Sequence, residues 1–191
     1  MTDKVTTARI LSTKLPFQMG RYSLRSILGE GGMARVYRAT LEGPGGFRKE
    51  VALKVILNPD HQRDPESGGG LSREARLCGL LKHPNVVDVY DFGVANGSQY
   101  IAMEVVNGLS IRQVIRQLGP LPPSVCLEIA SCVCDGLQHA HGLMFEGRNA
   151  GLVHRDLTPG NIMIDRNGVV KIMDFGLART GPWNEQSVED E

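Results

Sequence analysis

Apolar and polar residues alternate along the first part of the chain in short runs that are typical of β-strands. Residues 22–28 and 34–39 follow this alternation, and residues 51–57 form a denser apolar run. Glycines separate the first two runs, and the Gly-Pro-Gly-Gly of residues 43–46 separates the second from the third. Such glycine clusters favour hairpin turns, so we predict three consecutive strands.

A second group of elements follows a polar connection. Residues 72–81 place leucines on one side of a short helix, and residues 86–92 and 99–106 have the pattern of two more strands. Asn96-Gly97 between these strands is a dipeptide that tight hairpin turns favour. The pattern therefore predicts a mostly antiparallel five-stranded sheet with one helix.

The second part of the chain changes to a helical period. Ile111, Val114, Ile115 and Leu118 are spaced three and four residues apart, as on one face of a helix. Residues 122–141 form a longer helical segment whose apolar residues point nearly all round the axis. Because a helix of this kind must be buried on several sides, we expect it to pack against more than one neighbour.

Composition and charge exclude some classes of function. Of 191 residues, 41% are hydrophobic and 22% are charged, which is ordinary for a globular protein. Basic and acidic residues number 21 each, so the chain lacks the basic excess typical of proteins that bind nucleic acids. No apolar run approaches the about 20 residues of a membrane span, and no signal peptide is recognisable. We expect a cytoplasmic protein with no nucleic-acid partner and no membrane segment in this chain.

The four cysteines, Cys78, Cys126, Cys132 and Cys134, are expected to be free thiols. Cys132 and Cys134 are two residues apart in a helical segment and do not face each other, which disfavours a shared metal ion. Small apolar residues in a reducing compartment are the favoured interpretation.

A glycine-rich turn and a lysine are the first candidates for chemistry. Residues 28–36 read Leu-Gly-Glu-Gly-Gly-Met-Ala-Arg-Val, and such glycines let the backbone offer N–H groups to phosphates. A hairpin turn without a ligand is the alternative. Lys54 lies within the apolar run 51–57, where an ammonium group needs partners. Phosphate oxygens and the carboxylate of Glu74 would supply them, unless Lys54 simply points to water.

Two acidic motifs follow the long helix. Residues 154–161 read His-Arg-Asp-Leu-Thr-Pro-Gly-Asn, and residues 174–176 read Asp-Phe-Gly. Phosphoryl transfer from ATP needs one carboxylate at the acceptor hydroxyl, and an amide and a second carboxylate on Mg²⁺. Asp156 is placed for the first task, and Asn161 and Asp174 are placed for the second. A second Asp-Phe-Gly, which begins at Asp91, lacks this context, and we assign it no catalytic role.

These motifs in this order resemble the protein kinase superfamily over roughly residues 20–180, and the loop is similar to that of bacterial serine/threonine kinases of the eukaryotic type. The resemblance implies an α+β, protein-kinase-like two-lobed fold with ATP and Mg²⁺ bound between the lobes. Residues 1–19 are then an N-terminal tail. Residues 20–106 are an ATP-binding N-lobe with the complete sheet and its helix. Residues 107–191 are a truncated helical C-lobe with the catalytic loop and the start of the activation segment.

The resemblance also implies roles for single residues. Asp156 is the expected base, Lys54 would grip the α- and β-phosphates and pair with Glu74, and Asn161 and Asp174 would bind the metal. Met103 occupies the gatekeeper position. The residues expected to contact ATP are Leu28, Gly29, Glu30, Gly31, Gly32, Met33, Ala34, Val36, Ala52, Lys54, Met103, Glu104, Val106 and Met163.

Three features depart from the family pattern. Ala34 replaces the third glycine of the loop. Thr158, which we count among the catalytic positions, replaces the lysine that touches the γ-phosphate in most serine/threonine kinases, so slower transfer is expected. The chain ends at Glu191, inside the expected activation segment and before an Ala-Pro-Glu motif. We therefore expect helix 122–141 to expose an apolar face that a partner or the missing C-lobe helices would cover.

The motifs support one function and leave two alternatives. The first interpretation is a domain fragment of an ATP-dependent serine/threonine protein kinase, which phosphorylates hydroxyl groups of an unidentified protein. In that case Arg155 would pair with a phosphate on Thr180 as a regulatory contact. The sequence leaves open whether this truncated chain is itself active. The main alternative is a catalytically impaired, pseudokinase-like module that binds ATP and acts through interactions. The other is a small-molecule phosphotransferase of similar fold.

Overall fold

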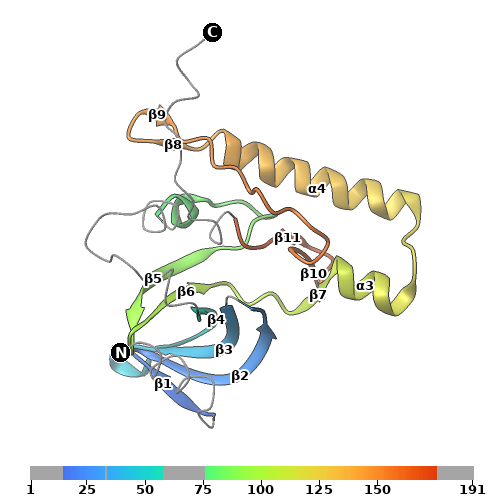
Figure 1. The fold of residues 1–191 in the computed structure, drawn as a ribbon. Coiled ribbons are helices and arrows are strands. Elements are labelled where there is room, and N and C mark those ends of the chain that lie inside the picture. Colours follow the sequence, from blue (N-terminus) through green and yellow to red (C-terminus); the bar gives the residue numbers. More distant parts are fainter. Residues whose placement is uncertain (1–14, 33, 58–75, 176–191) are drawn as a thin grey trace.

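The structure, a computed structural model, describes residues 15–32, 34–57 and 76–175. Its first part is a curled antiparallel sheet of six strands in the order β1-β2-β3-β4-β6-β5 (Figure 1). A short 3-10 helix, η1 (Pro44–Gly46), connects β3 and β4, and residues 76–80 are helical. The strands are β1 (Phe17–Met19), β2 (Tyr22–Glu30), β3 (Ala34–Glu42), β4 (Arg48–Ile56), β5 (Val89–Ala95) and β6 (Ser98–Met103).

The sheet has one strand more than the five predicted, and the assignment of residues 1–19 to a tail needs correction at its end. Phe17 pairs with Leu24 and Met19 pairs with Tyr22, so β1 is an edge strand of the sheet. Met19 is fully buried, and this burial explains why the chain is ordered into the sheet before residue 20. Three residues are too few for a period of two to be recognised.

The curl of the sheet brings its two ends together. Asp91 of β5 accepts hydrogen bonds from the Tyr22 hydroxyl of β2 at 2.5 Å and from the Tyr100 hydroxyl of β6 at 3.0 Å. Its Oδ2 also lies 2.9 Å from Nη2 of Arg21. Burial alone would raise the pKa of the Asp91 carboxyl, but these three donors outweigh it and lower the pKa. Asp91 therefore connects strands that lie far apart in the strand order, which gives this second Asp-Phe-Gly a structural role.

β4 is a central strand of the sheet, and its two faces pack against different parts of the core. Successive residues of a strand point to opposite faces. Val51, Leu53 and Val55 belong to a cluster enclosed by the curled sheet, whereas Ala52 belongs to a cluster shared with the rest of the molecule. Lys54 alternates with Leu53 and Val55 and so lies on the Ala52 face.

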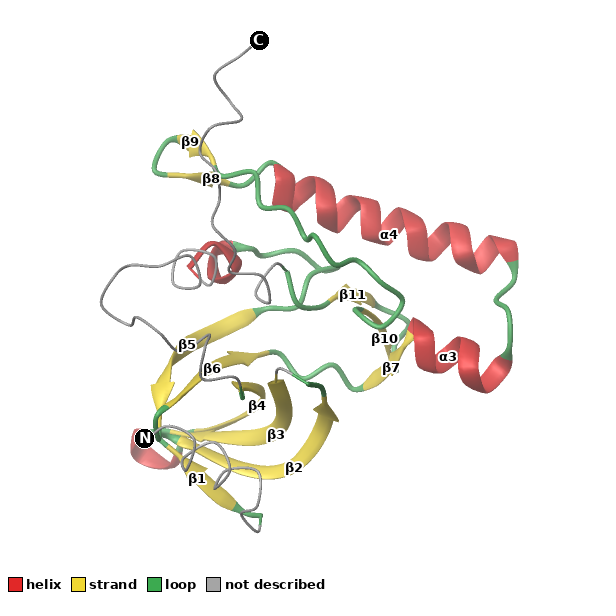
Figure 2. Cartoon of the chain, viewed as in Figure 1, coloured by secondary structure: helices red, strands yellow, loops and turns green. Residues whose placement is uncertain are grey.

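The second part of the described chain contains helices and short strands (Figure 2). Its main helices have the periods predicted from the sequence, and a capping box of Ser110 and Gln113 begins the first. A Cβ on Gly108 would lie 1.8 Å from the Ile164 carbonyl oxygen, so only glycine permits this pairing of strands. The elements are β7 (Gly108–Ser110), α3 (Ile111–Leu118), α4 (Pro123–His141), β8 (Met144–Phe145), β9 (Arg148–Asn149), β10 (Ile162–Asp165) and β11 (Val170–Ile172).

The long helix α4 is buried along one stripe rather than on several sides. Val133, Gly136 and Ala140, spaced three and four apart, are its buried residues. Leu127 is 72% exposed, so this apolar side chain lies on an uncovered face of the helix. The partner that would cover this face remains a prediction.

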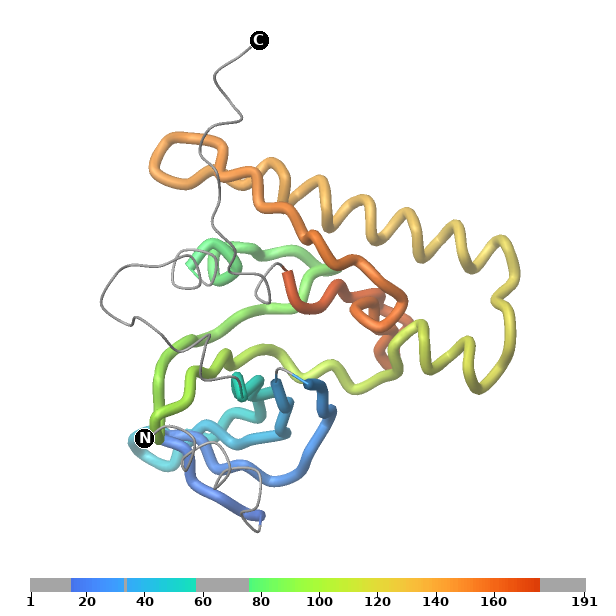
Figure 3. Tube along the Cα trace, in the orientation of Figure 1, coloured from blue at the N-terminus to red at the C-terminus, as the bar shows by residue number. Residues whose placement is uncertain are grey.

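Residues 83–88 attach the curled sheet to the second part of the chain and run beside β11 (Figure 3). The Val87 N–H donates to the Ile172 carbonyl at 3.0 Å, and the Ile172 N–H donates to the Asn85 carbonyl at 2.8 Å. Asn85 Nδ2 donates to the Val170 carbonyl at 2.8 Å. One apolar cluster, which includes Ala52, Val86 and Ile172, continues across this junction. The two predicted lobes, divided between residues 106 and 107, therefore share one apolar core. The division itself remains a prediction.

Candidate active site

Lys54 and Asp174 meet although they are far apart in the sequence. Lys54 Nζ lies 2.9 Å from Asp174 Oδ1, with the side chains 11% and 30% exposed. Asp174 adopts a left-handed backbone (φ 58°), which is uncommon for a residue other than glycine. This pair supplies the partner that a lysine in an apolar strand requires. The sequence did not predict Asp174 as the partner of Lys54, and Glu74, the carboxylate that it did predict, lies outside the described residues.

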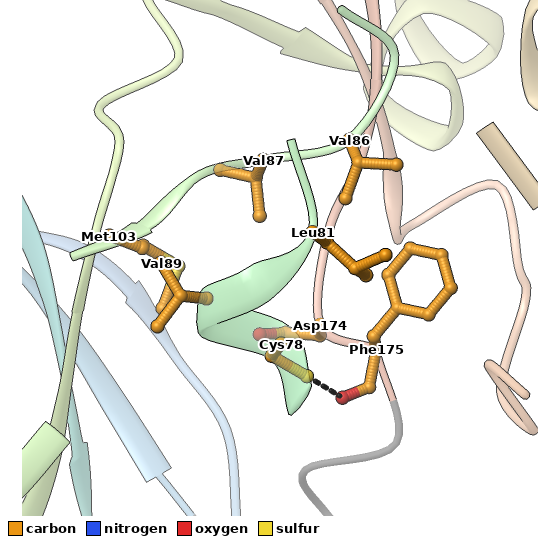
Figure 4. Close-up of a pocket in the computed structure, with 8 residues that line it drawn as sticks. All are labelled: Cys78, Leu81, Val86, Val87, Val89, Met103, Asp174 and Phe175. Atoms are coloured by element: carbon orange, nitrogen blue, oxygen red, sulfur yellow. Dashed lines mark hydrogen bonds between the residues drawn. The ribbon is translucent and has the colours of Figure 1, made fainter. Parts of the chain in front are cut away.

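Phe175 is buried beside Asp174 and fixes the direction of the Asp-Phe-Gly motif. It is 3% exposed, and its ring centroid lies 4.8 Å from that of His154. Cys78 Sγ donates to the Phe175 carbonyl at 3.6 Å (Figure 4). With Phe175 inward, the Asp174 carboxylate is free to face Lys54.

The side chains in Figure 4 line a cavity of about 10 Å³, which is room for roughly one water molecule. Its lining residues are Cys78, Leu81, Val86, Val87, Val89, Met103, Asp174 and Phe175.

His154 orders the loop that carries the predicted base. It is 2% exposed, its Nε2–H donates to the Met173 carbonyl at 2.7 Å, and its Nδ1 accepts the Asp156 N–H at 3.3 Å. The tautomer protonated at Nε2 satisfies both contacts. The sequence motif indicated no separate role for His154. Its position directly after the apolar pair Leu152-Val153 is the signal that could have indicated a buried, structural role.

Asp156 and Asn161, the predicted base and a predicted metal ligand, are hydrogen-bonded to each other. Asn161 Nδ2 donates to the Asp156 carbonyl at 2.8 Å and to Asp156 Oδ2 at 3.2 Å. The Asn161 N–H donates to the Thr158 carbonyl at 2.9 Å, which closes the loop. The Asn161 amide oxygen accepts no hydrogen bond from the described residues, so it is left for another ligand. The Asn161 carbonyl accepts the Met173 N–H at 2.8 Å, which ties this loop to the segment before Asp174.

The glycine-rich turn lies between β2 and β3, where the sequence placed it. The Gly31 N–H donates to the Ala34 carbonyl at 2.9 Å. A Cβ on Gly29 or Gly32 would meet no atom within 4 Å in the described part of the chain beyond its own neighbours. Packing within the chain therefore does not require glycine there, whereas a phosphate close to the backbone would. Leu28 is 46% exposed.

Several of the side chains predicted to contact ATP lie on neighbouring strands of the curled sheet. Met103 pairs with Ala52 across β6 and β4, and Val36 pairs with Lys54 across β3 and β4. Val36, Ala52, Met103 and Val106 belong to, or pack against, the cluster that contains Phe175. Met163 is half-buried in β10, opposite Ser110 and Lys171.

Three predicted site residues cannot be placed. Met33, Glu74 and Thr180 lie outside the described residues. Arg155 has a left-handed backbone (φ 62°), and its pairing with a phosphate on Thr180 stays a prediction. The sequence interpretation also gave Lys171 no role, although it lies in an apolar strand as Lys54 does. The structure places Lys171 Nζ 2.8 Å from Glu104 Oε2.

The sequence profile of the family described as "Protein kinase domain" matches residues 22–189, which is most of the chain. The chain belongs to the protein kinase family. The serine/threonine-protein kinase PknB of Mycobacterium leprae is 40% identical to this kinase over 171 residues, which are 87% of this chain and 26% of that protein. The serine/threonine-protein kinase PrkC of Bacillus subtilis is 39% identical over 159 residues, which are 83% of this chain and 23% of that protein.

A solved structure supports the fold. The crystal structure of the PknI kinase domain of Mycobacterium tuberculosis superposes on this kinase with a TM-score of 0.70 at 29% identity, and the match covers 88% of this chain and 64% of that chain. The predicted protein-kinase-like fold is therefore confirmed. The kinase spans about a quarter of the length of the curated relatives it matches.

Membrane-spanning helices and preformed metal clusters are both missing from the described part of the chain. Within residues 15–32, 34–57 and 76–175, no helix is both long and apolar enough to span a membrane. The same residues contain no group of three or more His, Cys, Asp or Glu side chains that could hold a metal ion. Mg²⁺ at kinase-type sites is held by one or two protein oxygens together with phosphates, so Asn161 and Asp174 suffice in number.

Proposed function

We propose that this kinase transfers the γ-phosphate of Mg-ATP to serine or threonine hydroxyl groups of a protein substrate. The observation that carries this proposal is the meeting of Lys54 with Asp174. This ion pair connects β4, a central strand of the curled sheet, to the Asp-Phe-Gly motif. The Met173 N–H, directly before Asp174, donates to the carbonyl of Asn161, which is itself hydrogen-bonded to Asp156. The cation and the carboxylate that phosphoryl transfer requires thus come together from positions 54 and 174 of the chain.

Each residue has a task in this reaction. The Lys54 ammonium group binds and orients the α- and β-phosphate oxygens, and the open backbone around Gly29 and Gly32 offers N–H groups above them. Asp156 Oδ2, already within hydrogen-bond distance of Asn161, accepts the proton of the acceptor hydroxyl. The Thr158 side chain carries no charge, so this chain lacks one cation that usually stabilises the transferred group.

The residues present fit Mg²⁺. Mg²⁺ prefers oxygen ligands, and the Asn161 amide oxygen and the Asp174 carboxylate are oxygen donors. The Asn161 amide nitrogen is directed to Asp156, which leaves its oxygen for the metal. When bound, Mg²⁺ supplies positive charge that neutralises the phosphates of the nucleotide.

The substrate class and the compartment belong to the same proposal. The relatives named as serine/threonine-protein kinases support hydroxyl acceptors, and their names give no support to a pseudokinase. All four cysteines are free, including the buried Cys78, as expected for a protein of the reducing cytoplasm.

The direct test is transfer of labelled γ-phosphate from Mg-ATP to a generic basic protein by the purified chain. We expect labelling in the wild type and none in Asp156→Asn. Asp135→Asn, an exposed carboxylate on α4, is the matched control and should label normally. Labelling that survives in Asp156→Asn, or no labelling by the wild type, would contradict the proposal.

A further inference from the structure

The linker between β6 and β7, residues 104–107, is fixed at both ends. At its start, the Glu104 N–H donates to the Asp88 carbonyl at 2.8 Å. At its end, the Asn107 carbonyl accepts the Arg166 N–H at 3.1 Å, and Asn107 Oδ1 accepts from Arg38 Nη2 at 2.8 Å. A linker held in this way presents its backbone groups in a defined position.

The carboxylate of Glu104 adds a second attachment at the start of the linker. Its Oε2 accepts from Lys171 Nζ at 2.8 Å and from the Asp88 N–H at 3.3 Å. The side chains of Lys171 and Glu104 are only 15% and 26% exposed. Both charges are therefore largely removed from water, and each depends on the other for compensation.

The strand that carries Lys171 cannot easily move away. Ile172 exchanges backbone hydrogen bonds with Asn85 and Val87, and Asn85 Nδ2 binds the Val170 carbonyl. Val170 and Ile172 are 5% and 0% exposed. Lys171 thus extends from a fixed backbone to the linker, and its ammonium group joins β11 to the start of that linker.

The neighbouring charged groups do not replace Lys171. Asp88 carries its own cation, because Lys82 Nζ lies 3.1 Å from Asp88 Oδ1. Tyr90 lies close enough that its pKa is raised by burial and by the negative charges of Glu104 and Asp88. Without Lys171, the Glu104 carboxylate would therefore lie near the Asp88 carboxylate and the Tyr90 phenol, whose ring is already covered by Lys49.

We propose that Lys171 is a positioning residue for the adenine base of a bound nucleotide. Through the Glu104 carboxylate it holds the backbone of residues 104–106 where that backbone can hydrogen-bond the base. This inference rests on the proposed function, since it assumes that adenine binds at the linker. It predicts that Lys171 affects every ligand with an adenine ring, irrespective of its phosphates.

The test is isothermal titration calorimetry of the full 191-residue chain with Mg-ATP and with adenosine. We expect Lys171→Met to weaken both ligands by the same factor, about tenfold, which corresponds to about 1.4 kcal/mol. Lys171→Arg, which keeps the cation, should retain most of the affinity. Lys82→Met is the matched control, because it removes the neighbouring cation of an exposed pair, and it should leave both affinities within about twofold.

The outcomes are distinguishable. A purely structural role would reduce the fraction of binding-competent protein, seen as lower stoichiometry, while the dissociation constant of the remainder stayed the same. Unchanged dissociation constants in Lys171→Met, an equal loss in Lys82→Met, or a wild type that binds Mg-ATP but not adenosine would each overturn the inference alone. A wild type that binds neither ligand would overturn the proposed function and this inference with it.

Discussion

Replacement of Asp91 by alanine is expected to destabilise the curled sheet by about 3 kcal/mol. Asp91 Oδ2 accepts from Arg21, Tyr22 and Tyr100 and so closes the sheet between β2 and β5. The substitution removes the acceptor and leaves three donors. The cost of each lost contact depends on how completely its donor is buried.

The Tyr22 contact contributes most. Tyr22 is 1% exposed, so its hydroxyl would lose a charged acceptor without access to water, which costs about 1.5–3 kcal/mol. Tyr100 is half-buried, and its longer bond contributes about 1 kcal/mol. The Arg21 side chain is 56% exposed, and an exposed ion pair contributes between about 0 and 1 kcal/mol. For a chain of 191 residues, about 3 kcal/mol corresponds to a fall in Tm of about 6–12 °C.

Urea unfolding followed by far-UV circular dichroism measures this loss. Glu42→Ala is the control, because Glu42 pairs with Arg25 at 3.9 Å and both side chains are about half exposed. We expect Glu42→Ala to change the free energy of unfolding by less than about 0.5 kcal/mol. If Asp91→Ala cost no more than Glu42→Ala, the closure of the sheet by Asp91 would be refuted.

The remaining predictions concern pH, packing, the exposed helix and the metal. The pKa of Asp91 is lowered from its ordinary 3.8, so the charged carboxylate stabilises the fold above that value. This stability is lost as pH falls through the folded pKa, so the difference in unfolding free energy between the wild type and Asp91→Asn should shrink as pH falls below about 5. Gly136→Ala would place a Cβ 2.9 Å from Ile172 Cδ1 and should destabilise by about 1 kcal/mol in urea unfolding. Leu127→Glu, at 72% exposure, should lower self-association in light scattering with little change in Tm. Asn161→Ala should raise the Mg²⁺ concentration needed for ATP to increase Tm.

Local patterns predicted the elements well because their signals lie close together in the sequence. Asn96 and Gly97 have positive φ angles of 50° and 73°, as the hairpin turn expected from their dipeptide requires. α3 spans Ile111–Leu118, which are the limits of its apolar period. The long helix begins at Pro123 rather than Pro122, because Pro122 serves as its N-cap.

Contacts between distant residues could not be predicted in this way. Asp91 binds Tyr22 across 69 positions, and no local period reveals which strands a curled sheet brings together. β1 escaped detection because three residues carry too little pattern. Lys171 is different, since it is a cation inside an apolar strand as Lys54 is, and such a cation requires a buried partner.

The thermal stability of the purified chain with and without Mg-ATP tests the central claim most directly. A ligand that binds only the folded state raises Tm. We predict a rise in the wild type that disappears in Lys54→Met, because Lys54 faces Asp174 at 2.9 Å. Lys49→Met is the matched control on the same strand, where Lys49 Nζ lies 3.3 Å from the Tyr90 ring centroid, and it should keep the rise. No rise in the wild type, or an equal rise in Lys54→Met, would contradict a nucleotide site at this position.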